Sequence, residues 1–210
     1  MKNFSLGGRM DRRQQKTRAA ILQACIDLLK EKDFRHITVG DIAKRADINR
    51  GTFYLHFTDK YDMLDSFENE MAEKIERVIV ENVPKEPDLR LFIESRYDTI
   101  VQILTCYQEN RELLHFLLKC NYSSFQAKLR NKLKRVINEH IFPQLEKLKV
   151  ELALPADLFV IAFTSISLSL AEYVYQSQTP LNVEQSAKFL FNIFLQGPAR
   201  TLGLLQDEHA

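Results

Sequence analysis

The side chains with the clearest chemical potential lie between positions 50 and 60, where polar, aromatic and basic residues alternate with glycine and phenylalanine. An arginine can form two hydrogen bonds with a guanine edge, hydroxyl and imidazole groups can bond to phosphates or bases, and a lysine can pair with a phosphate. Glycine lets a backbone approach a partner closely. The residues of these types are Arg50, Gly51, Thr52, Tyr54, His56 and Lys60. The chemistry that they suit is contact with a nucleic acid.

Local signals place this group on a short helix that follows a sharp turn. Thr38 and Asp41, three residues later, form the pattern of a capping box at the start of a first helix. Asp47 is expected in the turn, because aspartate tolerates a left-handed backbone better than most residues. Asn49 is a good N-cap for the second helix. The apolar face of the first helix consists of Ile42, Ala43 and Ala46.

The second helix, residues 50–56, is too short to be stable alone, so it must be anchored from one side. Phe53 and Phe57 are expected to face inward, which leaves the polar residues on the outer side. A helix-turn-helix places its second helix in the major groove of DNA, and the outward residues here suit that position. A tight helical corner with solvated polar residues is the alternative. Thr58 is expected to cap a third helix that has Lys60 in its first turn.

This stretch resembles the signature of TetR-type transcriptional regulators. The matching residues are Thr38, Val39, Asp41, Ile42, Ala43, Ala46, Ile48, Gly51, Thr52, Phe53, Tyr54, His56, Phe57, Lys60 and Leu64. Asp47 departs from the resemblance by replacing the glycine common in the turn, and Leu55 stands where an aromatic or polar residue often faces DNA. From the motif and the resemblance together, the expected DNA contacts are Arg18, Thr38, Val39, Asn49, Arg50, Gly51, Thr52, Tyr54, His56 and Lys60.

Charge is unevenly distributed along the chain. Residues 1–60 contain 13 Lys or Arg and 7 Asp or Glu, whereas residues 61–210 contain 16 and 21, so the net charge of +1 conceals a basic N-terminal part. This asymmetry favours a polyanionic partner for the N-terminal part alone.

Apolar periodicity predicts helices along the whole chain, with no alternating strand pattern. The expected helices are residues 12–32, 59–82, one that begins after Asp88, and then 110–119, 124–148, 157–176 and 183–196. Pro143 is expected to kink or shorten its helix, and Gly197 with Pro198 is expected to end the last one. The basic residues on the helix 124–148 are expected to form a solvated face: Lys128, Arg130, Lys132, Lys134 and Arg135.

The predicted fold class is therefore all-α. Residues 1–58 are expected to form a three-helix DNA-binding domain with the helix-turn-helix, and residues 59–210 a helical effector-binding and dimerisation domain. The helix 59–82 is expected to link the two.

The last two helices are apolar on more than one face, which indicates burial on more than one side. The resemblance implies that they pair with their symmetry mates in a homodimer. The expected interface residues are Phe159, Phe163, Ile166, Leu170, Leu190, Phe191 and Phe194.

The resemblance also implies a small-molecule effector that releases DNA, so that the chain acts as a repressor. A mostly apolar pocket with a few polar anchors is the usual form of such a site. The expected ligand-binding residues are Tyr97, Cys106, His115, Tyr122, His140, Glu172 and Tyr173. For each of them, a place in the core or on the surface is the alternative.

Motifs of other functional classes are missing from the sequence. There is no glycine-rich phosphate loop, no His-Glu-x-x-His and no nucleophile elbow, and the three cysteines have neither metal-ligand nor redox spacing. We therefore expect no catalytic site, metal or cofactor. The apolar run 158–175 is interrupted by polar residues, which favours a buried helix over a membrane span. Without a secretory signal, we expect a cytoplasmic protein. A helical interaction protein that does not bind DNA, and an enzyme without a recognisable motif, remain as alternatives.

Overall fold

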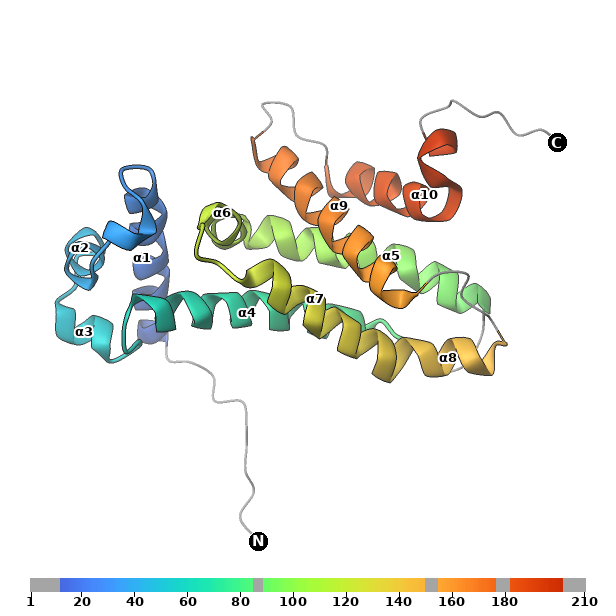
Figure 1. Ribbon diagram of the computed structural model, residues 1–210, viewed down its shortest axis with the longest axis horizontal. Coiled ribbons are helices and arrows are strands. Elements are labelled where there is room, and N and C mark those ends of the chain that lie inside the picture. Colours follow the sequence, from blue (N-terminus) through green and yellow to red (C-terminus); the bar gives the residue numbers. More distant parts are fainter. Residues whose placement is uncertain (1–11, 85–88, 150–154, 177–181, 202–210) are drawn as a thin grey trace, which may run out of the picture. The chain divides into compact units, whose positions relative to one another are not determined.

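The computed structural model of the chain describes residues 12–84, 89–149, 155–176 and 182–201 (Figure 1). Within these ranges every regular element is a helix. The prediction of an all-α fold is therefore confirmed. The chain divides into two compact units, which are described separately below.

Unit 1 contains the predicted helix-turn-helix. It comprises α1 (Arg12–Leu29), the 3₁₀ turn η1 (Phe34–His36), α2 (Val39–Arg45), α3 (Arg50–Tyr54), residues 60–67 of α4 (Lys60–Glu81), and Lys119–Ser123. Helix α1 ends three residues before its predicted end at position 32, because the chain turns there toward η1. The largest fully buried side chains of unit 1 are Ile21, Phe34, Ile37, Ile42, Phe53 and Met63. These residues form the core against which the two motif helices pack.

Unit 2 begins at Glu68 and contains the remaining described helices. They are the rest of α4, α5 (Leu89–Glu109), α6 (Arg111–Lys119, up to Leu118), α7 (Phe125–Val136), α8 (Phe142–Lys147), α9 (Ala156–Gln176) and α10 (Val183–Thr201). Helix α5 packs against both α9 and α10, and α7 packs against α9. The core therefore lies between α5 and the helices that cover it. The assignment of DNA binding to residues 1–58, and of effector binding and dimerisation to residues 59–210, stays a prediction.

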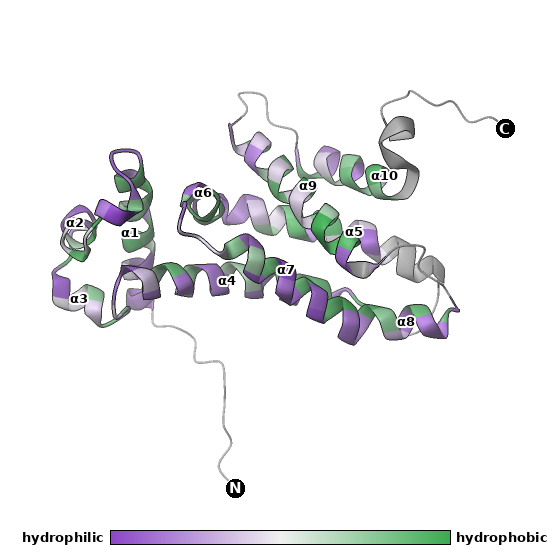
Figure 2. Cartoon of the chain, in the orientation of Figure 1, coloured by the Kyte–Doolittle hydropathy of each residue, from purple (hydrophilic) through white to green (hydrophobic). Residues whose placement is uncertain are grey.

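Helices α4 and α7 are joined by ion pairs, which corrects the expectation of a solvated basic face on α7 for Lys128 and Lys132, whereas Lys134 and Arg135 are exposed as expected. Glu76 of α4 accepts hydrogen bonds from Lys132 and Arg135, each at 2.6 Å. Glu68 is almost fully buried and pairs with Lys128 at 2.8 Å. Figure 2 shows hydrophilic and hydrophobic residues alternating along both helices.

Two prolines have different consequences for their helices. A π-helical turn, η2 (Ile137–Ile141), directly precedes α8, which carries Pro143 in its first turn, so the regular α-helix that starts at Phe125 is interrupted before this proline. The prediction that Gly197 and Pro198 end the last helix is wrong, because α10 continues to Thr201. Proline removes one backbone hydrogen bond from a helix, and α10 continues despite that loss.

Helix α9 leaves much of its apolar surface uncovered. Within the described residues, its segment Asp157–Gln176 is long and apolar enough to cross a membrane by length and composition, yet most of it is not buried inside the chain. Leu158, Phe159 and Ile161 are each about half exposed. Phe163, Ile166, Phe191 and Phe194 are partly exposed, whereas Leu170 and Leu190 are buried in the chain's own core. Leu170 and Leu190 are therefore core residues rather than interface residues in this structure.

Candidate nucleic-acid interface and ligand cavity

The predicted caps of the helix-turn-helix are present. Thr38 accepts a hydrogen bond from the backbone N–H of Asp41, whose carboxylate accepts one from the backbone N–H of Thr38, so the capping box is complete. Lys32 also donates to Asp41, and with the bonds from Thr38 it holds the pKa of that carboxyl well below its usual range. Asn49 accepts from the backbone N–H of Thr52 at 2.7 Å and so caps α3.

The turn and the anchors also follow the prediction. Asp47 has a φ of 53°, the left-handed conformation that the turn requires. Phe53 and Phe57 are both buried, and their ring centroids lie 5.6 Å apart. Because the anchors face inward, the opposite side of α3 is left open to solvent. Thr58 is not the cap of α4, since Asp59 accepts from the backbone N–H groups of Tyr61 and Asp62.

The exposed side of α3 carries a compact group of residues with different chemistry. Arg50 and Gly51 are exposed at its start, and Tyr54 and Leu55 are 55% and 84% exposed at its end. Sequence reasoning assigned no contact to Leu55, although it is the most exposed of the large hydrophobic residues in the described chain. Its position directly after Tyr54, which was expected to face DNA, could have indicated that Leu55 is exposed on the same surface.

Arg50 is positioned by α2 as well as by α3. A Cβ atom added to Gly40 of α2 would lie 2.5 Å from Nη2 of Arg50, so the guanidinium lies directly against the Gly40 backbone. No side chain larger than hydrogen fits there without displacing Arg50. The backbone of α2 therefore helps to determine the direction of the Arg50 side chain, which α3 carries.

Other predicted DNA contacts have bonding roles inside unit 1. Thr38 and Asn49 serve as caps, and the hydroxyl of Thr52 donates to Asn49 at 3.1 Å. Val39 is half-buried in the first turn of α2. Their placement at the N-terminal ends of α2 and α3 still puts backbone N–H groups near the exposed surface, where anions are favoured. Contact of these residues with DNA stays a prediction.

Arg18 and His56 interact with the aromatic core of unit 1. The Arg18 guanidinium lies 4.8 Å from the Phe57 ring centroid and 5.1 Å from that of Phe67, and it donates to Ser66. Burial lowers the pKa of His56, and the charge of Arg18 lowers it further. Both effects favour the neutral imidazole of His56, which can still form hydrogen bonds, over the cation.

Lys60 reaches inward over a long sequence separation. Its ammonium donates to the carbonyl oxygens of Phe34, Arg35 and Ile37, each at 2.8 Å. An ammonium has three donors, so these bonds match its full capacity. Burial lowers the pKa of Lys60, and the carboxylates of Asp33 and Asp59 oppose that effect. Lys60 thus closes the C-terminal end of η1, and its contact with a phosphate stays a prediction.

Unit 2 contains a cavity of about 620 Å³. It is lined by residues of α5, α6, α9 and α10 and by Asn182, which caps α10 by accepting from the backbone N–H of Gln185. Its apolar wall consists of Leu104, Leu114, Leu118, Leu170, Ala171, Val174 and Val183. The volume falls within the range typical of sites for small organic ligands.

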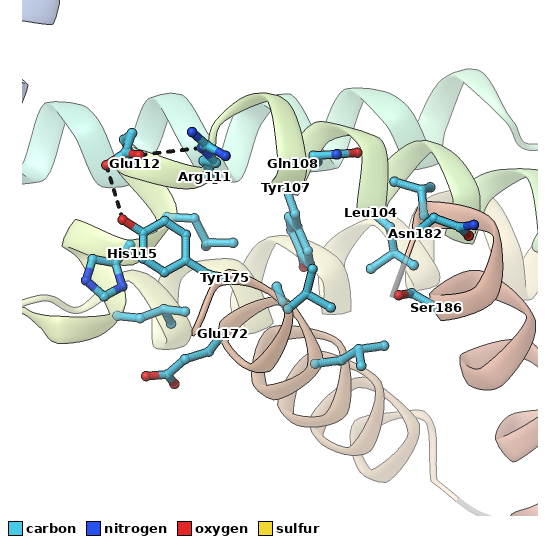
Figure 3. A pocket seen from close by; sticks show the side chains of 16 residues that line it. Leu104, Tyr107, Gln108, Arg111, Glu112, His115, Glu172, Tyr175, Asn182 and Ser186 are labelled. Atoms are coloured by element: carbon cyan, nitrogen blue, oxygen red, sulfur yellow. Dashed lines mark hydrogen bonds and ion pairs between the residues drawn. The ribbon is translucent and has the colours of Figure 1, made fainter. Parts of the chain in front are cut away.

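The charged groups of the cavity lie toward one end, together with His115 and Tyr175 (Figure 3). The ring of His115 stacks on that of Tyr175, with centroids 4.3 Å apart and an interplanar angle of 16°. The Tyr175 hydroxyl donates to Glu112 at 3.3 Å. Glu172 lies on the same helix, three residues before Tyr175. Burial raises the pKa of Tyr107, which also lines the cavity, although a hydrogen bond with Ser167 opposes that shift.

The residues expected to bind a ligand do not all meet here. His115 and Glu172 line the cavity, but Tyr97 packs edge-on against Phe191, and Cys106 lines a shallow groove with Lys74. His140 lies on the π-helical turn, and Tyr173 is largely exposed. Sequence reasoning missed Glu112, Gln108, Asn182 and Ser186, because helical periodicity does not tell which helices face one another.

Tyr122 belongs to unit 1 and therefore is not part of this cavity. Its ring lies 5.9 Å from that of Phe34, and the Arg35 guanidinium lies 5.9 Å from its centroid. It was expected at the ligand site as one of the aromatic side chains in the central part of the chain, but the segment Lys119–Ser123 packs with the helix-turn-helix unit.

Cysteine chemistry and metal binding have no support in the described residues. Cys25, Cys106 and Cys120 are buried free thiols. Burial raises the pKa of Cys25 to about 12, and the neighbouring Cys120 contributes to the shift, so Cys25 is a poor nucleophile. Where the chain is described, no group of three or more His, Cys, Asp or Glu side chains is placed to hold a metal ion.

Comparison with known proteins agrees with this geometry. Residues 21–67 match the model for "Bacterial regulatory proteins, tetR family". The uncharacterised HTH-type transcriptional regulator YxbF of Bacillus subtilis is 33% identical over 110 residues, which cover 51% of this chain and 28% of that protein. The fatty acid metabolism regulator protein of the same organism is 32% identical over 105 residues, which cover 44% of this chain and 54% of that protein.

A solved structure extends the similarity over most of the fold. The transcriptional regulator FadR from Bacillus subtilis, in complex with stearoyl-CoA, has a TM-score of 0.60, covering 85% of this chain and 98% of that chain at 19% identity. The chain spans about half or less of the length of the curated relatives cited above. The helix-turn-helix at residues 38–57 thus lies within a segment that matches the TetR family of bacterial regulatory proteins, and the all-helical fold is similar to that of a solved transcriptional regulator.

Proposed function

We propose that the chain is a sequence-specific DNA-binding regulator that represses transcription and leaves its operator when a small molecule binds in unit 2. The observation that carries the proposal is the exposed side of α3, where Arg50, Gly51, Tyr54 and Leu55 are presented together. A helix held by an N-cap and two buried phenylalanines, with these residues outward, has the form of a recognition helix. On this proposal unit 1 binds DNA and the chain is cytoplasmic and not an enzyme.

The proposal includes a homodimer, because one short recognition helix reads too few base pairs for specificity. Two copies would place their α3 helices in successive major grooves, on the order of 34–36 Å apart. The uncovered apolar residues of α9, together with the partly exposed phenylalanines of α10, support pairing through these helices. A stable interface of this kind buries on the order of 2,000 Å² or more.

The cavity of unit 2 supports the effector part of the proposal. Its size and its mixture of an apolar wall with a few polar groups fit a small organic ligand. A ligand releases DNA only if it binds the non-operator conformation more tightly, and the release cannot exceed that difference in affinity. Two matched relatives are connected by name with fatty acid metabolism or with stearoyl-CoA.

Selection of duplexes from a random DNA library, followed by mobility-shift titration of the selected sequence, tests the proposal. We expect a palindromic operator bound by two copies of the chain. Arg50→Ala should weaken operator binding by about 1–3 kcal/mol and relax the preference at one base pair. Arg77→Ala, which removes an exposed arginine of α4 in unit 2, is the matched control and should leave binding unchanged. Failure to enrich any sequence would contradict the proposal.

A further inference from the structure

The residues that line the cavity of unit 2 include two carboxylates and one guanidinium, so their formal charge is negative. Glu112 comes from α6 and Glu172 from α9, and the guanidinium among the lining residues belongs to Arg111. Figure 3 shows Glu112, His115, Tyr175 and Glu172 at the same end of the cavity, with Asn182 and Ser186 toward the other. The end that carries Glu112 and Glu172 is therefore acidic, and the end that carries Asn182 and Ser186 is neutral.

Both carboxylates are held in place by neighbouring side chains. Glu112 accepts from Tyr175 at 3.3 Å and lies 3.5 Å from Nε of Arg111, and Glu172 accepts from Gln176 at 3.0 Å. These contacts fix the direction of each carboxylate at the lining of the cavity.

Aromatic rings lie between the two acids. The stacked pair of His115 and Tyr175 joins α6 to α9, and the Tyr175 hydroxyl connects that pair to Glu112. Aromatic faces attract cations, and they do so in addition to any carboxylate nearby. The same cavity is also lined by the aliphatic wall of leucine and valine side chains. Acids and aromatic rings in one cavity with an aliphatic wall suit a ligand with a positive charge on an apolar body.

We infer that this cavity binds an apolar organic cation, with the charge at the end that carries Glu112, Glu172 and the aromatic rings, and the apolar body against the aliphatic wall. The inference rests on the proposed function in that this ligand is the effector of the regulator. A free fatty acid or an acyl-CoA is disfavoured, because its anionic group would meet two carboxylates and a guanidinium that is already paired with one of them. This chain therefore differs in effector class from the relative that was solved with stearoyl-CoA.

Two ions of nearly the same shape and opposite charge provide the test. Tetraphenylphosphonium and tetraphenylborate present the same four phenyl rings, so a difference in affinity reports charge alone. We expect calorimetric titration of the full chain to show phosphonium bound about tenfold or more tightly than borate, as a net negative site requires. Glu112→Gln and Glu172→Gln should each weaken phosphonium binding by roughly two- to fivefold, the range for partly solvated ion pairs.

Glu146→Gln is the matched control, because it removes an exposed carboxylate from α8 of the same unit, outside the cavity lining. It should leave both affinities unchanged. The inference is overturned if borate binds as well as phosphonium, if neither glutamine variant in the cavity weakens phosphonium binding, or if neither ion binds the folded chain. Displacement of phosphonium by stearoyl-CoA at lower concentration would also overturn it, in favour of an acyl anion.

Operator release separates this inference from the proposed function. Phosphonium should dissociate the complex with the selected operator, and Glu172→Gln should raise the concentration needed without changing operator affinity in its absence. If the chain binds no DNA specifically but still prefers the cation, the proposed function fails and the ligand class stands. If the operator is bound but borate releases it as well as phosphonium does, the ligand class fails and the regulator stands.

Discussion

The guanidinium of Arg50 lies against the backbone of Gly40, so closely that a methyl group at position 40 would come within 2.5 Å of Nη2. Because Gly40 of α2 has no side chain, the guanidinium of Arg50 from α3 occupies the space beside its backbone. The displaced group would be the far end of a flexible side chain, so relief requires only that Arg50 move. The position of Arg50, rather than the stability of the fold, is what depends on this glycine.

Gly40→Ala should therefore separate stability from DNA recognition. Alanine is favoured over glycine inside a helix by about 1 kcal/mol, so thermal unfolding should occur at an equal or higher temperature. Operator affinity should fall by as much as about tenfold, because the added Cβ at position 40 displaces the Arg50 guanidinium from its native position. In a double-mutant cycle, Gly40→Ala should have little further effect once Arg50 is alanine. Additive losses would show that Gly40 acts on binding by another route.

Leu55 should read a thymine methyl group in the operator. It is the C-cap residue directly after α3 and is 84% exposed, and an apolar side chain in the major groove recognises that methyl group. Replacing each operator thymine in turn by deoxyuridine removes only the methyl. We expect one symmetric pair of substitutions to weaken binding of the native chain but not of Leu55→Ala, measured by mobility shift.

Tyr54→Phe is the control for the Leu55 experiment, because it alters the adjacent exposed residue without changing apolar contact at position 55. This variant should keep the same sensitivity to deoxyuridine as the native chain. Equal binding of the native chain to every deoxyuridine duplex would exclude Leu55 as a methyl reader.

Short sequence patterns predict the local features of this structure, but they do not predict its long-range contacts. The caps at Thr38 and Asn49 and the turn at Asp47 depend on neighbours within three or four residues, so spacing alone predicts them. The pairing of Glu76 with Lys132 joins residues 56 positions apart, and no helical period specifies that distance. For this reason the expected solvation of α7 was wrong for Lys128 and Lys132, which pair with α4.

The ligand residues illustrate the same limit. His115 and Glu172 were expected in the site for their chemistry, and the fold brings them to one cavity. Tyr122 was expected there because of its position in the sequence, but it follows the last turn of α6 into unit 1. Chemistry can be read from residue types, but the assignment of a residue to a cavity requires knowledge of which helices pack together.

Lys60 should contribute more to the stability of unit 1 than to the salt dependence of DNA binding. Lys60→Met removes three hydrogen bonds from an ammonium to carbonyl oxygens, which should lower the free energy of unfolding by about 1–3 kcal/mol in urea titration. The slope of log K against log salt should be unchanged for the folded variant. A decrease in that slope by about 0.9 would instead establish a phosphate contact. Lys44→Met, an exposed lysine of α2, is the control for charge.

A charge on the exposed face of α9 should prevent dimer formation without unfolding the chain. Ile161 is about half exposed, so Ile161→Glu leaves the core of unit 2 intact while placing a carboxylate in the proposed interface. Sedimentation should show monomers, and operator affinity should fall steeply because two recognition helices no longer act together. Val80→Glu, on the exposed side of α4, should remain a dimer. A dimeric Ile161→Glu protein would place the interface elsewhere.

The pairing of Glu76 with α7 should make the stability of unit 2 depend on acid pH. Burial by itself raises the pKa of Glu76, but the hydrogen bonds from Lys132 and Arg135 outweigh it and leave the pKa below its ordinary value. A carboxyl whose pKa is lowered by folding stabilises the fold above its unfolded pKa, and this contribution disappears as the pH falls through the folded pKa. The relevant window therefore lies below the ordinary glutamate pKa of about 4.3.

Glu76→Gln should accordingly lower the free energy of unfolding by about 1–2 kcal/mol at pH 7, because two cations of α7 lose their partner. The difference from the native chain should shrink as the pH falls below the ordinary glutamate pKa, since the native Glu76 is then protonated as well. Urea titrations at a series of pH values measure both effects. Glu73→Gln, an exposed position on the same helix, should show neither. A pH-independent difference between Glu76→Gln and the native chain would mean that packing of the side chain, rather than its charge, joins α4 to α7.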